Sequence, residues 1–138
     1  LLKAFWPARF EILREHPVFI LDGGHNLQCA KAVRESLEEY YPQEKFILLL
    51  GVLGDKNYQE EIKIFKNTCS EAICISPNSI RAVNAAVLAD ICNENGISAV
   101  ACDTIKDGVR LAIEKKKPVL AFGSLYSAGE IRNIVLGE

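Results

Sequence analysis

Short apolar segments alternate with amphipathic segments of helix length along almost the whole chain, and this alternation constrains the fold most. Five segments are rich in Val, Ile, Leu and Phe without strict polar alternation: residues 18–21, 46–50, 72–75, 99–101 and 119–122. Such segments are typical of strands buried on both faces, as in parallel sheets covered by helices. Each is therefore predicted to be a strand.

Apolar residues at helical spacing separate these strands. The predicted helix faces are Leu27, Ala30, Val33, Leu37 and Tyr40; Tyr58, Ile62 and Phe65; Val83, Val87 and Ile91; Ile105, Val109 and Ile113; and Ile131, Ile134 and Val135. Tyr41-Pro42, Asn95-Gly96 and Lys117-Pro118 are predicted to end the first, third and fourth helices.

Residues 10–13 can form a sixth strand, and the short connection through Pro17 predicts that it is antiparallel to its successor, at an edge. The expected fold class is α/β: a doubly wound, mostly parallel six-stranded sheet with one antiparallel edge strand, formed by residues 1–138 as a single domain.

Charge and cysteine content narrow the class of protein. A net charge of -2 and no Lys/Arg cluster beyond residues 115–117 disfavour nucleic acid as a partner. No segment has the roughly 20 apolar residues of a membrane span. The five scattered cysteines, never spaced as CxxC, favour a reducing, cytoplasmic location and a role as small core residues rather than metal ligands. The start at Leu1 rather than Met suggests a fragment of a longer chain.

In a sheet of this kind, ligands bind at the carboxyl ends of the strands, next to helix N-termini. Five loops meet that description: residues 22–26, 51–57, 76–81, 102–104 and 123–126.

The first loop, Asp22-Gly23-Gly24-His25-Asn26, is the most informative, because two glycines permit close backbone approach and three polar side chains follow one another closely. Asp22 is expected to contact a ligand or to cap a turn. His25 is interpreted as functional, with a structural histidine as the alternative. Asn26 is equally well explained as a helix N-cap.

Several catalytic motifs are missing from the sequence. It contains neither G-x-G-x-x-G nor G-x-x-x-x-G-K-[ST], so the chain has no dinucleotide fingerprint and no P-loop of its own. It also has no G-x-S-x-G elbow, so hydrolase chemistry has little support.

Four blocks carry a resemblance to a known family. They are Trp6-Pro7-Ala8-Arg9-Phe10-Glu11, Ile20-Leu21-Asp22-Gly23-Gly24-His25-Asn26, Gly51-Val52-Leu53-Gly54-Asp55-Lys56-Asn57-Tyr58 and Gly123-Ser124-Leu125-Tyr126. In order and spacing they resemble the C-terminal domain of folylpolyglutamate synthases and dihydrofolate synthases. That family usually reads W-P-G-R, D-G-A-H-N and D-K-D, whereas this sequence has Ala8, Gly24 and Asn57.

The resemblance implies the C-terminal part of a ligase that phosphorylates a folate or dihydropteroate carboxylate with ATP and Mg²⁺ and then joins it to L-glutamate. The P-loop and the metal ligands are expected in an N-terminal domain outside this chain, which therefore has no catalytic residue by itself. Arg9 and Asp22 are implied to contact ATP, and His25 and Ser124 to hold glutamate. Asn26, Lys56 and Arg81 are further candidates; for Lys56 and Arg81 the alternative is a solvated surface charge.

Two alternatives remain at this stage. One is a Mur-type peptidoglycan ligase, which shares the reaction type. The other is a non-catalytic, flavodoxin-like regulatory module such as a receiver domain, although a receiver needs a cluster of acids after its first strand, and this sequence has one Asp followed by glycines.

Overall fold

The protein is built on one six-stranded sheet. The computed structural model describes residues 9–24, 26–54, 57–123 and 125–137. The strands are β1 (Glu11–Glu15), β2 (Val18–Asp22), β3 (Phe46–Gly51), β4 (Cys69–Cys74), β5 (Ser98–Ala101) and β6 (Val119–Gly123), arranged in the order β1-β2-β6-β3-β4-β5. Among these six strands, β1 and β2 pair antiparallel and the other neighbours pair parallel. The predicted fold class is confirmed.

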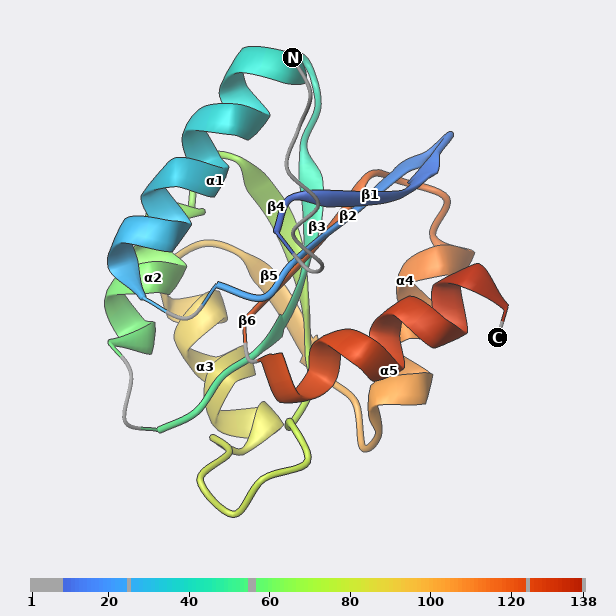
Figure 1. Ribbon diagram of the computed structural model, residues 1–138. Coiled ribbons are helices and arrows are strands. Elements are labelled where there is room, and N and C mark those ends of the chain that lie inside the picture. Colours follow the sequence, from blue (N-terminus) through green and yellow to red (C-terminus); the bar gives the residue numbers. More distant parts are fainter. Residues whose placement is uncertain (1–8, 25, 55–56, 124, 138) are drawn as a thin grey trace.

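In the described part of the chain, helices cover both faces of the sheet (Figure 1). α1 (Leu27–Tyr40), α2 (Tyr58–Ile64) and α3 (Ala85–Glu94) pack on one face, and α4 (Ile105–Glu114) and α5 (Leu125–Leu136) pack on the other. Successive strand residues point to opposite faces, so Leu48 and Leu50 belong to the first core layer and Ile47 and Leu49 to the second. This explains why β2, β3 and β6 are buried along their whole length.

The predicted buried face of the third helix is only partly confirmed. Val83 and Ile91 pack against the core, but Val83 precedes α3 and Val87 is 44% exposed. The helix instead buries Ala85, Leu88, Ala89 and Cys92. Small Ala and Cys side chains let the helix pack closely on the sheet, and a search for large apolar residues at helical spacing misses such a face.

Two other details at helix ends differ from the prediction. Tyr40, the last residue of α1, is 64% exposed, and its ring lies 6.5 Å from that of Phe10 instead of in the core. α4 ends at Glu114, before Lys117-Pro118, and Lys116 takes up a left-handed φ of 56°. The other two predicted ends are confirmed: Tyr41 caps α1, and Gly96 follows α3 at a φ of 81°.

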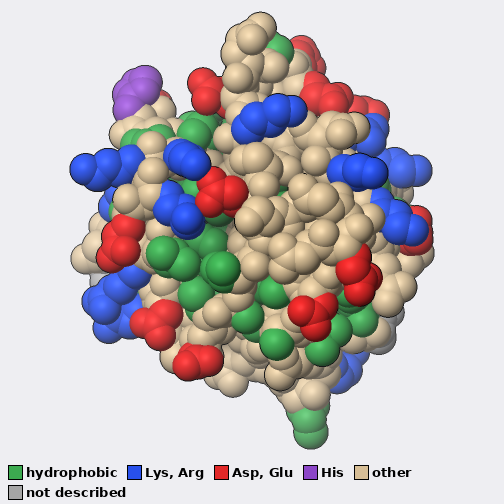
Figure 2. All heavy atoms as spheres, turned by 180° about the vertical axis from the view of Figure 1, so that it is seen from behind, with side chains coloured by type: hydrophobic (Ala, Val, Ile, Leu, Met, Phe, Trp, Pro, Cys, Tyr) green, Lys and Arg blue, Asp and Glu red, His purple; other side chains and the backbone are tan. Residues whose placement is uncertain are grey.

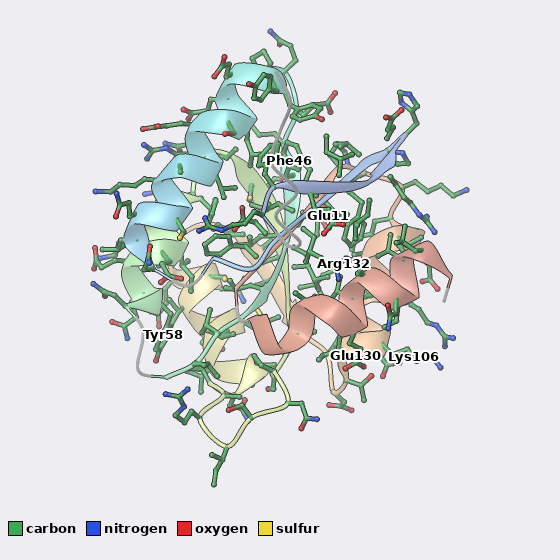
Figure 3. All side chains as sticks on the ribbon, viewed as in Figure 1. Glu11, Phe46, Tyr58, Lys106, Glu130 and Arg132 are labelled. Atoms are coloured by element: carbon green, nitrogen blue, oxygen red, sulfur yellow. The ribbon has the colours of Figure 1, made fainter. Side chains whose placement is uncertain are left out.

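The edge strand β1 is held against α5 by side chains as well as by its partner strand. Arg132 of α5 donates through Nη2 to Glu11 Oε1 at 2.8 Å and through Nε to both carboxylate oxygens (Figure 3). Arg14 donates to the carbonyl of Val135 at 3.3 Å. Since β1 directly follows Arg9 and Phe10, these contacts fix where that segment approaches the sheet.

Three of the five cysteines lie in the core. Cys69, Cys74 and Cys92 are buried core residues, and all five cysteines are free thiols, as expected of small core side chains. Figure 2 shows Lys and Arg side chains interspersed with Asp and Glu over the face that it presents. Among the described helices, none is long and apolar enough to cross a membrane.

Candidate functional site

The carboxyl ends of β2, β6 and β3 lie side by side and form the centre of the candidate site. In the parallel registers Asp22 pairs with Phe122, and Gly51 pairs with Gly123. The first, second and last of the predicted ligand loops therefore leave the sheet from three adjacent strands. The sequence could not show this adjacency, because β6 lies between β2 and β3 in the sheet although β4 and β5 separate it from β3 in the chain.

A glycine is required at the end of β6, where that strand meets the end of β3. Gly123 has a φ of 133°, and a Cβ at that position would lie 1.8 Å from the carbonyl oxygen of Gly51. No side chain fits in that space or readily adopts that backbone conformation. The two backbones thus approach each other closely at the base of the site.

The carboxylate of Asp22 organises the loop on the other side of the site. Oδ1 accepts from the backbone N–H of Gly24 at 2.8 Å, and Oδ2 accepts from the N–H of Phe10 at 2.9 Å. The residue is 5% exposed. Burial raises the pKa of the Asp22 carboxyl, while the N–H groups of Gly24 and Phe10 and the charge of Arg9 oppose that rise.

Arg9 and Asp22, the two predicted ATP contacts, are brought together. Arg9 is exposed, and its charge is close enough to Asp22 to act on the pKa of that carboxyl. Three other predicted residues, His25, Ser124 and Lys56, lie outside the described residues. The segments next to them belong to the same edge of the sheet, since Gly24 follows β2, Gly123 ends β6 and Gly54 follows β3.

Asn26 caps the N-terminus of α1, which is the structural explanation that the sequence left open for it. Its Oδ1 accepts from the N–H of Cys29 at 2.8 Å, which makes it the N-cap of α1. Thr104, in the loop after β5, likewise caps α4 by accepting from Asp107 N–H at 3.0 Å. β5 is at the far edge of the sheet, so the Thr104 loop is separated from Asp22 by three strands.

Arg81 lies in the loop that connects β4 to α3, which projects toward the bottom of Figure 1. Its side chain is exposed, its N–H donates to Ser79 Oγ at 3.2 Å, and its carbonyl accepts from Gly54 at 2.8 Å. Val83 N–H also donates to Val52, at 3.0 Å. These bonds join the loops after β3 and β4, so Arg81 is at the same edge but one strand farther from Asp22 than Gly51 is.

Ser127, in the first turn of α5, is a site residue that the sequence analysis missed. It is 3% exposed and lines a small cavity of about 10 Å³ together with Asp22, Gly23, Gly51 and Gly123. The only sequence signal is its place shortly after Gly123, which does not distinguish a core-facing serine from an exposed one.

The described residues include no group of three or more His, Cys, Asp or Glu side chains arranged to hold a metal ion.

Comparison with known proteins identifies the family. The model of the Mur ligase, glutamate ligase domain matches residues 8–125. The chain belongs to this family. The Mur ligase match includes the segments that carry Arg9, Asp22 and Gly123, and it does not favour the receiver-like alternative.

Individual relatives point to the folate branch of the Mur ligase family. The domain is 33% identical over 136 residues to a dihydrofolate synthase/folylpolyglutamate synthase of Bacillus subtilis. The match covers 96% of this chain but 31% of that protein, so the chain spans about a third of its relative's length.

Solved structures share the fold of this Mur ligase domain. A Mycobacterium tuberculosis folylpolyglutamate synthase complexed with ADP matches with a TM-score of 0.87 at 21% identity, over 95% of this chain and 32% of the other. A bifunctional folylpolyglutamate synthase/dihydrofolate synthase with Mn, AMPPNP and L-glutamate bound matches with a TM-score of 0.81 at 25% identity, over 93% of this chain and 31% of the other.

Proposed function

We propose that this chain is the C-terminal domain of an ATP-dependent ligase that joins L-glutamate to the carboxylate of a folate or of dihydropteroate. The observation that carries the proposal is that the glutamate ligase family match includes Arg9 and Asp22, which are neighbours at one edge of the sheet. The names of the relatives support the folate branch over a peptidoglycan ligase.

Arg9 has the chemistry to bind the nucleotide. A guanidinium presents several N–H donors in a planar arrangement that suits phosphate oxygens, and the Arg9 side chain is exposed at the site. ATP with a divalent metal supplies the phosphoryl group that activates the carboxylate. The contribution of Arg9 is to bind and orient the phosphates, with its position set by Phe10 and β1.

Asp22 has less freedom to meet a ligand. Each of its oxygens already accepts one backbone N–H, so a ribose hydroxyl or an adenine-side donor would use a remaining lone pair. Its larger contribution in this proposal is to hold the Arg9–Phe10 segment against the Gly23–Gly24 loop.

His25 and Ser124 are proposed to bind the incoming glutamate. They flank the described segments at the ends of β2 and β6, where the first turn of α5 offers backbone N–H groups to a carboxylate. Lys56 and Arg81 remain secondary candidates on the neighbouring loops. Asn26 is proposed to act only as a cap.

The remaining parts of the enzyme are proposed to lie outside this chain. These are the P-loop, the ligands of Mg²⁺ and most of the folate site, in a domain N-terminal to residue 1. The five free thiols support a reducing, cytoplasmic location for the enzyme.

The proposal is tested by ATP kinetics of the full-length enzyme. Arg9→Ala is expected to raise the KM for ATP about tenfold or more, because a charge-assisted contact to phosphate is lost, and to change the KM for glutamate much less. Arg110→Ala, which removes an exposed arginine on α4, is the matched control. An unchanged KM for ATP in Arg9→Ala would contradict the assignment.

A second experiment uses the 138-residue chain alone with ATP, Mg²⁺, glutamate and either dihydropteroate or a folate. No amide product is expected, because positioning of the phosphoryl group depends on the P-loop. ATP-dependent glutamate addition by this chain alone would refute the proposal that the P-loop and the Mg²⁺ ligands lie in another domain.

A further inference from the structure

The cavity at the end of β2, β6 and β3 has the size and the lining of a site for one water molecule. Its volume is about 10 Å³, close to the smallest space that holds a water. Asp22, Gly23, Gly51 and Gly123 line it from the strand ends, and Ser127 and Ala128 line it from α5. Most of the other lining side chains are apolar, so a molecule inside depends on these few polar groups.

Ser127 supplies a polar group that needs a partner. The residue is 3% exposed, and its Oγ has no hydrogen-bond partner within the described part of the chain. A buried hydroxyl without a partner is unfavourable, and in folded proteins such groups are usually satisfied by the protein or by an ordered water.

Asp22 decides which kind of molecule fits. Its oxygens each accept one N–H, from Phe10 and from Gly24, and each retains acceptor capacity. A carboxylate or phosphate oxygen in the same cavity would be repelled by the Asp22 charge. A water molecule can donate to Asp22 and also exchange a hydrogen bond with Ser127 Oγ.

We propose that an ordered water occupies this cavity and bridges Ser127 Oγ to the Asp22 carboxylate, which makes Ser127 a positioning residue for Asp22. The bridge links α5 to the carboxylate that holds Phe10 and Gly24. The water bridge does not depend on whether Asp22 contacts ATP. Its tests are therefore independent of the proposed ligase function.

The first test is a crystal structure of the 138-residue chain at a resolution that shows ordered waters. We expect a water at about 2.7–3.0 Å from Ser127 Oγ and within hydrogen-bond distance of Asp22. A well-ordered cavity without that water would overturn the proposal, whatever the variants below show.

The second test measures the pKa of Asp22 by carboxyl carbon NMR in Ser127→Ala. Loss of a donor to the carboxylate is expected to raise that pKa by about half a pH unit to one unit. Thr68→Val is the matched control, because Thr68 is also buried with an Oγ1 that has no partner among the described residues. It precedes β4 and so lies at the amino ends of the strands, away from Asp22 at the carboxyl ends. An Asp22 pKa that is equal in the wild type and in Ser127→Ala would contradict the bridge.

Discussion

The backbone N–H of Phe10 donates to Oδ2 of Asp22 at 2.9 Å, twelve residues along the chain. Phe10 has a φ of 46°, a left-handed conformation that is uncommon for a bulky residue. The bond holds this conformation in place and brings the neighbouring Arg9 to the edge of the sheet where β2 ends. Asp22 thus determines the local path of the segment that carries the proposed phosphate contact.

Removing this carboxylate is expected to loosen both segments that it joins. Asp22→Ala leaves the N–H groups of Phe10 and Gly24 without their acceptor and should lower the free energy of unfolding by about 1–3 kcal/mol. Hydrogen exchange should accelerate at these two amides. Asp90→Ala, at an exposed position on α3, should leave both amides unchanged. Equal exchange in the wild type and in Asp22→Ala would show that the carboxylate does not hold them.

The raised pKa of Asp22 predicts a pH dependence of stability. Since burial raises the folded-state pKa above its ordinary value of 3.8, the folded protein binds the additional proton between the two values. The stabilisation that this proton gives is complete below the pKa of Asp22 in the unfolded state. It is lost as the pH rises through the pKa of Asp22 in the folded state. The difference in unfolding free energy between the wild type and Asp22→Asn should therefore fall from about pH 4 upward, as measured by urea denaturation.

Glu71 serves as a control, because its pKa is shifted in the opposite direction to that of Asp22. Hydrogen bonds from Lys117, at 2.6 Å, and from Lys115 lower the pKa of its carboxyl. Its stabilising contribution is present above the unfolded pKa and is lost as the pH falls through the lowered value. The same comparison with Glu71→Gln should thus show a difference that grows with pH. Identical pH trends for the two variants would contradict the Asp22 assignment.

Gly123 should tolerate no side chain. In Gly123→Ala the new Cβ would overlap the carbonyl oxygen of Gly51, and the backbone would remain at a φ of 133°. We expect a loss of more than about 3 kcal/mol in unfolding free energy, or no folded protein. Gly129→Ala is the matched control: it lies at an exposed position of α5, the new Cβ would meet nothing within 4 Å beyond its own stretch of helix, and it should stabilise by about 0.5–1 kcal/mol. Similar melting temperatures for both variants would be inconsistent with this packing.

Asn93 protects the edge strand β5. Its Oδ1 accepts from Ala99 N–H at 3.0 Å, and its Nδ2 donates to the Ala99 carbonyl at 3.2 Å. Asn93→Ala exposes both backbone groups, so it should cost about 1 kcal/mol and promote self-association through the edge. Sedimentation velocity checks the association, with the exposed Asn133→Ala of α5 as the control. A monomeric Asn93→Ala with slow exchange at Ala99 would count against this role.

Local sequence signals predict the order of the elements and most of their ends. Apolar segments buried on both faces specify parallel strands, Asn26 and Gly96 mark helix ends, and Pro17 lies in the short turn before an antiparallel neighbour. These signals are local, because each depends on backbone conformation or side-chain spacing within a few residues. The four sequence blocks also identified the family, and the positions of three of them after strands predicted the ligand-binding edge.

The tertiary structure alone decided which loops meet and what their side chains contact. The insertion of β6 between β2 and β3 places Gly123 against Gly51, and it brings Ser127 into the cavity beside Asp22. The engagement of Asp22 by Phe10 depends on β1 folding back along β2. The buried face of α3 was decided by how closely small side chains pack on the sheet. These relationships join residues distant in sequence, and their energies depend on burial and contacts that exist only after the sheet has formed.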